Sequence, residues 1–192
     1  IRMTDKNQFK LGENIATLPG KVVFENRMFQ LIQYTPTTDE VHETPLLICP
    51  PWINKFYILD LNEQKSMIRW LVAQGHTVFV MSWINPADEH RDETWESYLQ
   101  DGILTAVDKV LEETGQKQTN IVGYCIGATL LGTGLAYLAK KGDTRIKSAT
   151  FFTGQFDFSD AGELQAFVDD EVLDTVSQAA EEHGYLAAEN MF

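Results

Sequence analysis

The sequence predicts an α/β protein in which a mostly parallel sheet is covered by helices on both faces. Short continuous apolar runs recur along the chain, bounded by Gly, Pro or polar residues, which is typical of strands that are buried on both faces. Segments of helical length separate these runs. Because the crossover between two parallel strands is right-handed, this alternation places helices on both sides of the sheet.

The regular structure begins with an antiparallel hairpin and a central strand. In the segment 21–34, β-branched and aromatic residues lie on both sides of Glu25-Asn26, a polar pair that can turn a hairpin of two edge strands. The run 44–52 reads "TPLLICPPW" and is stopped by two prolines, so it predicts a central parallel strand.

A helix, a strand and a longer helix follow. Asn62 is the N-cap candidate of a helix that ends at Gly75, and residues 76–83 predict a second buried strand. A polar, proline-broken loop then leads to a helix at 95–115, where the apolar residues form one stripe and acidic residues occupy the other side.

The remainder of the chain adds two strands and two helical segments. Residues 119–123 and 146–154 predict the third and fourth strands, and the helix between them carries basic residues in its last turn. After Gly154 the sequence becomes acidic and helical, with no further apolar strand. Internal repeats are absent, and we expect one compact unit.

The composition excludes several classes of function. Lys and Arg total 15 against 28 Asp and Glu in 192 residues, so the formal net charge is −13 and nucleic acid is not an expected partner. No long apolar run and no signal peptide is visible, so we expect a cytoplasmic protein without a transmembrane segment. The two cysteines lack the closely spaced Cys and His of a zinc site, and neither a metal nor an organic cofactor is expected.

Cys125 is the strongest candidate for chemistry. It stands between Gly123 and Gly127, after a strand and at the start of a helix, which is the layout of a nucleophile elbow with cysteine in the position that serine usually holds. In such a turn the side chain projects above the sheet, and the flanking glycines let neighbouring backbone come close. The motif refines the fold prediction to an α/β-hydrolase-like core. The alternative is a buried cysteine at an ordinary glycine turn.

The same turn predicts an oxyanion hole. The helix that begins near Ile126 places partial positive charge beside the sulfur, and the Ile126 N–H faces any oxyanion on a bound acyl group. The second donor of such a hole usually comes from the loop after the neighbouring strand. We assign it to the backbone N–H of Ile53, with Trp52 as the alternative. Trp52, Trp83 and Trp95 are interpreted mainly as core and loop anchors.

A cysteine nucleophile favours acyl transfer over simple hydrolysis. Moving an acyl group from one sulfur to another is nearly neutral in free energy, so an enzyme that accepts acyl groups from a thioester can hold them without forming an overly stable ester.

Four segments carry a family resemblance. They are "PPWINKFYILDL" (50–61), "LVAQGHTVFVMSWINP" (71–86), "GYCIGATLLGTGLAYLA" (123–139) and "FDFSDAGELQAFVDDE" (156–171). In this order they resemble the signature blocks of the polyhydroxyalkanoate synthases, and most of all the single-subunit type that prefers short hydroxyacyl units. The resemblance covers most of the chain from about Lys21 onward.

The resemblance implies an acyltransferase that polymerises (R)-3-hydroxyacyl-CoA, typically 3-hydroxybutyryl-CoA, and releases CoA. It implies that Cys125 carries the growing chain as a thioester. It also implies action at the surface of a cytoplasmic polyester granule and a homodimer as the active form. CoA arrives with the substrate, and no separate cofactor is implied.

The sequence departs from the family pattern at its ends. In the family, the catalytic aspartate and histidine come after later strands of the sheet, and this sequence stops before those strands. Family members also have a further N-terminal domain ahead of the matching region. We therefore expect an incomplete core. Residues 1–162 are interpreted as the N-terminal half of an α/β-hydrolase-like catalytic domain, and residues 163–192 as the helical start of its lid segment.

Other titratable residues and other functions remain as alternatives. Asp157 and His183 give the order Cys, Asp, His of some hydrolases, although a capping acid and a solvated histidine are the simpler interpretations. His42, His76 and His90 are interpreted as surface residues. Two further functions stay open: a cysteine-dependent ester or thioester hydrolase, and a non-catalytic chain that binds the granule or an intact synthase.

Overall fold

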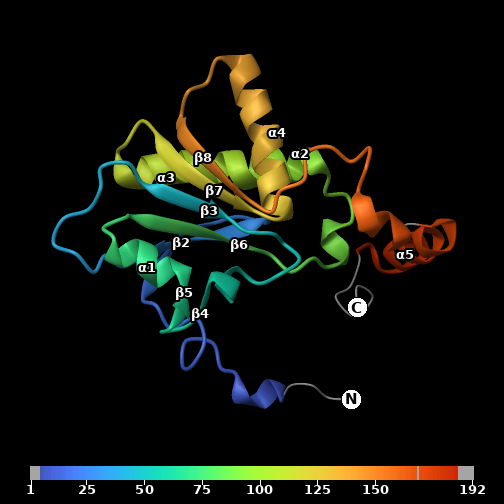
Figure 1. The fold of residues 1–192 in the computed structure, drawn as a ribbon, viewed down its shortest axis with the longest axis horizontal. Coiled ribbons are helices and arrows are strands. Elements are labelled where there is room, and N and C mark those ends of the chain that lie inside the picture. The colour runs from blue at the N-terminus through green and yellow to red at the C-terminus, as the bar shows by residue number, and fades with distance from the viewer. Residues whose placement is uncertain (1–4, 168, 186–192) are drawn as a thin grey trace.

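A six-stranded sheet runs through the molecule in the computed structural model, which describes residues 5–167 and 169–185 (Figure 1). Its strands are β1 (Gly20–Glu25), β2 (Phe29–Tyr34), β3 (Leu46–Cys49), β6 (Val78–Trp83), β7 (Thr119–Tyr124) and β8 (Ile146–Phe152). Their order across the sheet is β1-β2-β6-β3-β7-β8. The pairs β6–β3, β3–β7 and β7–β8 are parallel, whereas β1–β2 and β2–β6 are antiparallel. The predicted α/β fold with a mostly parallel sheet is confirmed.

The N-terminal hairpin is confirmed with one correction. β1 and β2 are joined at Asn26, whose side-chain oxygen accepts hydrogen bonds from the N–H groups of Met28 and Phe29 at 2.8 and 3.0 Å. Of the two hairpin strands, only β1 lies at an edge of the sheet, because β2 also pairs with β6. Phe29 and Leu31 of β2 are almost completely buried, so packing at those side chains favours an inner position for this strand.

The helices follow the predicted order, but the first begins later than predicted. The longer ones are α1 (Met67–Ala73), α3 (Thr105–Thr114), α4 (Ile126–Lys141) and α5 (Asp170–His183). Asn62 does not cap α1, because it lies in a small hairpin of β4 (Asp60–Asn62) and β5 (Lys65–Ser66), where its side chain accepts from two backbone N–H groups of the turn. Ser66 caps α1 instead and accepts a hydrogen bond from the Arg69 N–H at 2.9 Å.

The helical segment predicted at 95–115 is present but not uniform. It begins as α2 (Trp95–Ser97), continues as η4 (Tyr98–Leu104), which is π-helical, and ends as α3. Gly102 of η4 lies against the Trp83 indole so closely that a Cβ at this position would be 2.7 Å from a ring carbon. A π-helical stretch inside a longer helix is frequent at functional sites, and this one brings backbone directly against an aromatic ring.

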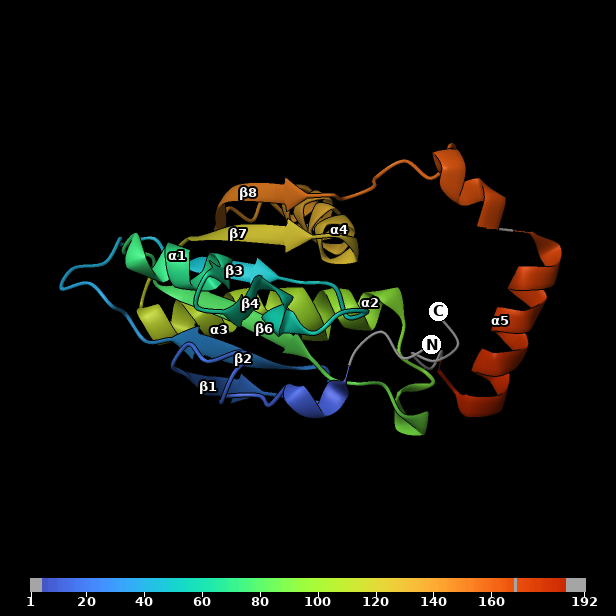
Figure 2. The same cartoon turned by 60° about the horizontal axis from the view of Figure 1, so that its bottom comes forward.

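Helices cover both faces of the sheet (Figure 2). α3 and α4 pack on one face against alternate strand residues such as Leu47 and Ile121. α1 packs on the other face against Ile48 and Val122, which directly follow Leu47 and Ile121 in the sequence. Because successive side chains of a strand point to opposite faces, one apolar run supplies both halves of the core.

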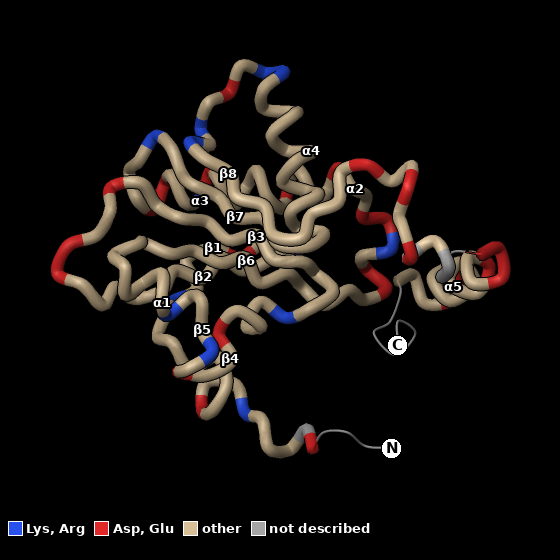
Figure 3. Tube along the Cα trace, in the orientation of Figure 1, with Lys and Arg blue, Asp and Glu red and all other residues tan. Residues whose placement is uncertain are grey.

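After β8 the chain leaves the sheet for two helical segments, η5 (Gly162–Phe167) and α5 (Figure 1). None of the described α5 side chains is buried, and acidic residues are conspicuous along this helix (Figure 3). Arg91, in the loop after β6, donates a hydrogen bond to the Glu181 carbonyl near the end of α5 at 3.4 Å. Within the described part of the chain, no helix has the length and the apolar character needed to cross a membrane.

Candidate active site

Cys125 occupies a strained turn between β7 and α4. Its φ of +54° and ψ of −127° lie in a region that residues with a side chain rarely adopt. The Cys125 N–H donates to the Phe152 carbonyl of β8 at 2.9 Å, and its carbonyl accepts from the Ala128 N–H at 2.9 Å. The backbone is therefore held from the sheet and from the helix at once, which keeps the cysteine in this conformation.

The two glycines around Cys125 allow close approach of backbone. A Cβ at Gly123 would lie 2.6 Å from the Ala128 Cα, and a Cβ at Gly127 would lie 2.8 Å from the Pro50 carbonyl oxygen. Neither glycine has a positive φ, so the requirement here is space and not backbone freedom. The tight strand–turn–helix geometry predicted for this motif is present.

The two cysteines lie in opposite environments. Cys49, at the end of β3, is completely buried, and burial raises the pKa of its thiol. Cys125 is half-buried at the carboxyl end of β7. A thiol without solvent access is a poor nucleophile, so Cys125 is the cysteine with the access that covalent chemistry needs.

The backbone groups assigned to the oxyanion hole lie on adjacent elements. Ile126 is the first residue of α4, and the first N–H groups of a helix have no carbonyl partner within it. Ile53 lies in the loop after β3, the strand next to β7 in the sheet, as expected. Its side chain is 47% exposed and does not anchor the loop. Trp52 is the anchor, because it packs with the buried core.

A hollow of about 380 Å³ opens beside the start of α4. Its lining residues are Trp95, Ile126, Thr129, Thr133, Phe156 and Phe158. Both threonine hydroxyls are already engaged, since Thr129 donates to the Gln155 carbonyl at 2.8 Å and Thr133 donates to the Thr129 carbonyl at 3.2 Å. The hollow therefore presents mainly methyl and aromatic groups, which accommodate an acyl chain better than a charged group.

Phe156 forms one wall of this hollow and lies closely against two glycines. A Cβ at Gly132 of α4 would lie 2.5 Å from the Phe156 ring, and a Cβ at Gly154 would also meet it, at 3.2 Å. The Phe151 ring packs edge-on to it, with centroids 5.1 Å apart. Sequence reasoning did not identify this wall, because the glycines read as ordinary small residues of a helix and a strand end.

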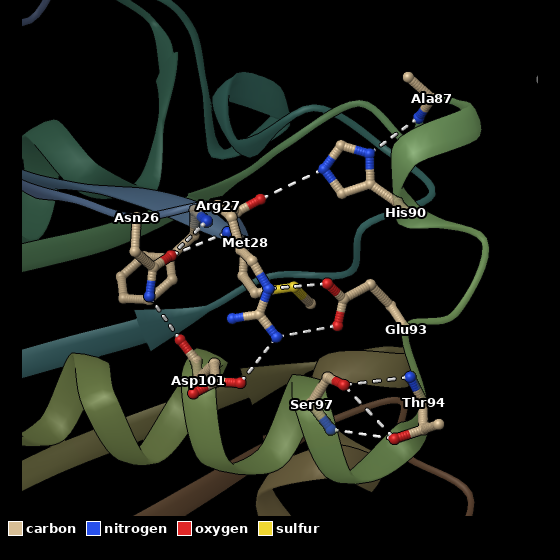
Figure 4. A network of polar contacts seen from close by, with 10 residues as sticks. Asn26, Arg27, Met28, Ala87, His90, Glu93, Thr94, Ser97 and Asp101 are labelled. Atoms are coloured by element: carbon tan, nitrogen blue, oxygen red, sulfur yellow. Dashed lines mark hydrogen bonds and ion pairs between the residues drawn. The ribbon is translucent and has the colours of Figure 1, made fainter.

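A polar network holds the loop that leads to Trp95 (Figure 4). Arg27, in the turn between β1 and β2, donates two hydrogen bonds to the Glu93 carboxylate at 2.8 and 3.1 Å and one to Asp101 of η4 at 2.9 Å. Hydrogen bonds from Ser97 and then from Arg27 lower the pKa of Glu93. The network ties the hairpin, the loop and η4 together.

Each of the four histidines is either at the far end of the strands from Cys125, in contact with another residue, or exposed on a helix. His42 and His76, with ring centroids 4.8 Å apart, precede β3 and β6 and so lie at the amino ends of these parallel strands, whereas Cys125 follows the carboxyl end of β7. His90 contacts the Arg27 carbonyl at 3.3 Å. His183 is an exposed residue at the end of α5.

Asp157 has a local structural contact. It is exposed, and its side chain accepts a hydrogen bond from the Ser159 N–H at 2.9 Å. This backbone hydrogen bond lowers the pKa of Asp157. This contact closes a local turn, so Asp157 does not cap a helix as expected, because the next helical segment, η5, begins only at Gly162.

Two protein families have sequence models that match the chain. The family described as Poly-beta-hydroxybutyrate polymerase (PhaC) N-terminus matches residues 1–71. The family described as alpha/beta hydrolase fold matches residues 44–187, which include β3, β7, Cys125 and α4. The second match covers most of the chain and agrees with the observed sheet.

Curated relatives match most or all of the chain. A poly(3-hydroxyalkanoate) polymerase of Methylorubrum extorquens is 52% identical over 191 residues, which are 100% of this chain and 32% of the relative. The poly(3-hydroxyalkanoate) polymerase subunit PhaC of Rhizobium meliloti is 50% identical over 100% of this chain and 31% of its own length. The subunit of Cupriavidus necator is 45% identical over 88% of this chain and 29% of its own length. The chain thus spans about a third of the length of these relatives.

Solved structures with the same fold are much more distant in sequence. A fungal esterase from Rhizomucor miehei aligns with 83% of this chain and 48% of its own, at a TM-score of 0.55 and 16% identity. A putative lipase from Sulfolobus solfataricus aligns with 85% of this chain and 63% of its own, at a TM-score of 0.51 and 13% identity. These likenesses concern the fold alone. The chain therefore belongs to the α/β-hydrolase fold family and is homologous, over its whole length, to poly(3-hydroxyalkanoate) polymerases.

Proposed function

We propose that this chain carries the nucleophile of a poly(3-hydroxyalkanoate) polymerase and that the nucleophile is Cys125. One observation carries the proposal: a half-exposed cysteine in a strained strand-to-helix turn, in a sequence 52% identical to a polymerase of this kind. The substrate is a (R)-3-hydroxyacyl-CoA, with 3-hydroxybutyryl-CoA as the first one to test. The sulfur of the nucleophile favours a thioester donor, because exchange between two sulfurs is nearly neutral in free energy.

The first step of the proposed reaction loads the enzyme. The Cys125 thiolate attacks the carbonyl carbon of the hydroxyacyl-CoA, and the electron pair of the C=O bond moves to oxygen. The N–H groups of Ile126 and Ile53 receive this oxyanion. The bond from carbon to the CoA sulfur then breaks, CoA leaves as a thiolate that takes up a proton, and the hydroxyacyl group remains on Cys125 as a thioester.

The second step lengthens the polyester. The hydroxyl of one hydroxyacyl unit attacks a thioester carbonyl and loses its proton to a general base, so that an ester bond forms and a thiol is released. In the proposal, this base is the histidine of the His–Asp pair that the family carries downstream. The hollow beside Ile126 holds the apolar part of the acyl group, because its lining presents methyl and aromatic surface. The proposal also includes action at the surface of a polyester granule and a homodimer as the active form. Only the family resemblance supports these two parts.

The test is loading of Cys125. The chain is incubated with 3-hydroxybutyryl-CoA, release of free thiol is followed, and the intact protein is analysed by mass spectrometry. We expect an adduct of one hydroxybutyryl group that Cys125→Ala abolishes and Cys49→Ala retains, because Cys49 is completely buried. No adduct on the native chain, or an adduct that persists in Cys125→Ala, contradicts the proposal. Free 3-hydroxybutyrate formed without a thioester or oligomer would indicate the hydrolase alternative.

A further inference from the structure

The loop that follows β3 has few backbone N–H donors that could stabilise its own conformation. It begins with Pro50 and Pro51, and neither residue has a backbone N–H. Two consecutive donors that could fix a turn are therefore missing just before Trp52 and Ile53. The orientation of the next peptide groups must be set by contacts from other elements.

Trp83 makes such a contact. It is the last residue of β6, the strand that pairs with β3, and its indole N–H donates to the Pro50 carbonyl at 2.7 Å. The same carbonyl lies against Gly127 at the start of α4, where a Cβ would be only 2.8 Å away. The Pro50 carbonyl is thus held between the indole on one side and the helix that carries Ile126 on the other.

The Trp83 ring is itself held in place. It packs against Trp52 with centroids 5.6 Å apart and an interplanar angle of 80°, and against Tyr98 at 5.4 Å. Gly102 of the π-helical stretch η4 leaves just enough room for its ring edge. A ring that is fixed by neighbours on several sides directs its N–H along one line, which makes the hydrogen bond to Pro50 specific in direction.

Trp52 extends the same aromatic cluster into the loop. The centroid of its ring lies 4.4 Å from the ring centroid of Tyr98 and 5.8 Å from that of Trp95. Trp52 comes immediately before Ile53, so its fixed ring and the fixed Pro50 carbonyl both restrain the chain just ahead of the N–H group assigned to the oxyanion. The direction of this N–H group depends on both contacts.

We propose that Trp83 is a positioning residue for the oxyanion hole: its indole N–H fixes the Pro50 carbonyl and thereby aims the backbone N–H of the following loop at the acyl group on Cys125. This inference rests on the proposed function and adds to it a residue that does not touch the substrate. Such a residue affects the formation of an oxyanion and leaves the exposure of the thiol unchanged.

The test separates these two properties. Trp83→Phe keeps an aromatic ring but lacks the N–H donor, and Trp70→Phe is the matched control because Trp70 of α1 is 60% exposed. For each variant, the rate of acylation of Cys125 by 3-hydroxybutyryl-CoA is compared with its rate of alkylation by iodoacetamide, which displaces iodide and forms no oxyanion. We expect acylation to fall at least about tenfold in Trp83→Phe while alkylation changes less than about twofold. Trp70→Phe should match the native chain in both rates.

A second variant and a second measurement guard against misfolding. Gly102→Ala keeps the indole N–H but displaces the ring, so it should lower the ratio of acylation to alkylation in the same direction. Amide hydrogen exchange of residues 52–54 should be faster in Trp83→Phe than in Trp70→Phe, whether or not the chain is acylated. Far-UV circular dichroism and thermal unfolding confirm that each variant is folded.

The outcomes distinguish the two proposals. Equal acylation in Trp83→Phe and the native chain, or an equal loss of acylation and alkylation, overturns the positioning role. Unchanged amide exchange in the loop also overturns it. If the native chain itself is not acylated at Cys125, the proposed function fails, and the exchange measurement alone then decides whether Trp83 orients the loop.

Discussion

At the scale of single residues, the surroundings and not the side chain decide which thiol can react. Cys49 and Cys125 have the same chemical group, yet the first ends a strand inside the core and the second stands in a strained turn at the carboxyl end of β7. The strain persists because hydrogen bonds from β8 and α4 hold the Cys125 backbone on both sides. Glycine at positions 123 and 127 is the condition for this arrangement.

Two glycines of α4 provide a matched pair for testing this condition. We expect Gly127→Ala to lower the free energy of unfolding by about 3 kcal/mol, because its Cβ would collide with backbone atoms of β3 and Pro50. Gly134→Ala should raise it by about 0.5–1 kcal/mol, because its Cβ would meet Leu99 at an ordinary 3.4 Å and alanine favours a helix. Urea denaturation measures both. Equal effects of the two substitutions would show that the turn has room to relax.

At the scale of elements, the molecule joins β1–β2, the loop after β6 and η4 through one arginine. Arg27 bridges Glu93 and Asp101, and these two acids lie on either side of α2 in the sequence (Figure 4). The loop carries Trp95 to the hollow beside Ile126, so this surface network helps to shape a hollow to which it contributes no direct contact. Exposed pairs of this kind contribute little singly, and more when one arginine donates to several oxygens.

The network should make stability depend on pH in a defined range. Hydrogen bonds from Ser97 and Arg27 lower the pKa of Glu93 in the folded protein. The Glu93 carboxylate therefore contributes fully to the free energy of unfolding above pH 4.5, its ordinary pKa, and this contribution is lost as the pH falls from there through the lowered pKa of the folded state. We expect Arg27→Ala to lower the free energy of unfolding by about 1 kcal/mol at pH 7 and by less at pH 3. Lys10→Ala, which breaks an exposed pair with Glu13, is the control and should change little at either pH. A pH-independent loss in Arg27→Ala would assign its effect to packing of the side-chain stem.

At the scale of the whole molecule, the two edges of the sheet differ in what they expose. β1 has two charged residues and one exposed aliphatic residue, Val22, whereas β8 exposes two aromatic residues near its end, Phe151 and Phe152, at 39% and 36% of their surface. An edge strand with unpaired backbone groups and exposed aromatic residues favours pairing with another chain. The net charge of −13 opposes such pairing at low ionic strength.

Association through β8 is therefore expected to be salt-dependent and sensitive to a charge on that strand. We expect the apparent mass of the chain in analytical ultracentrifugation to rise with salt, because salt screens the repulsion between acidic surfaces. Thr150→Lys, on the exposed β8, should reduce this association, because it places a charge on the pairing edge. Thr37→Lys, in an exposed loop, adds the same charge and should leave association unchanged or raise it slightly, because the net charge becomes less negative. Equal effects of the two lysines would assign association to net charge alone.

Sequence patterns predicted the parts of the structure that depend on neighbours along the chain. The succession of strands and helices along the chain, the glycine-flanked turn at Cys125 and the position of Ile126 at a helix start all follow from local periodicity and from steric limits on φ and ψ. The N-cap at Asn62 was wrong, because a hairpin turn engaged its side chain first. The roles of Cys125, Ile126 and Ile53 stay predictions.

The sequence by itself thus determined the fold class, the family and the identity of the candidate nucleophile. Only the tertiary structure decided that β2 lies inside the sheet, that η4 becomes π-helical against Trp83, and that the Trp83 N–H reaches the Pro50 carbonyl. The physical reason is distance along the chain. Local conformation is governed by neighbours a few residues away, whereas a contact across 33 residues exists only after the sheet has set the relative positions of both partners.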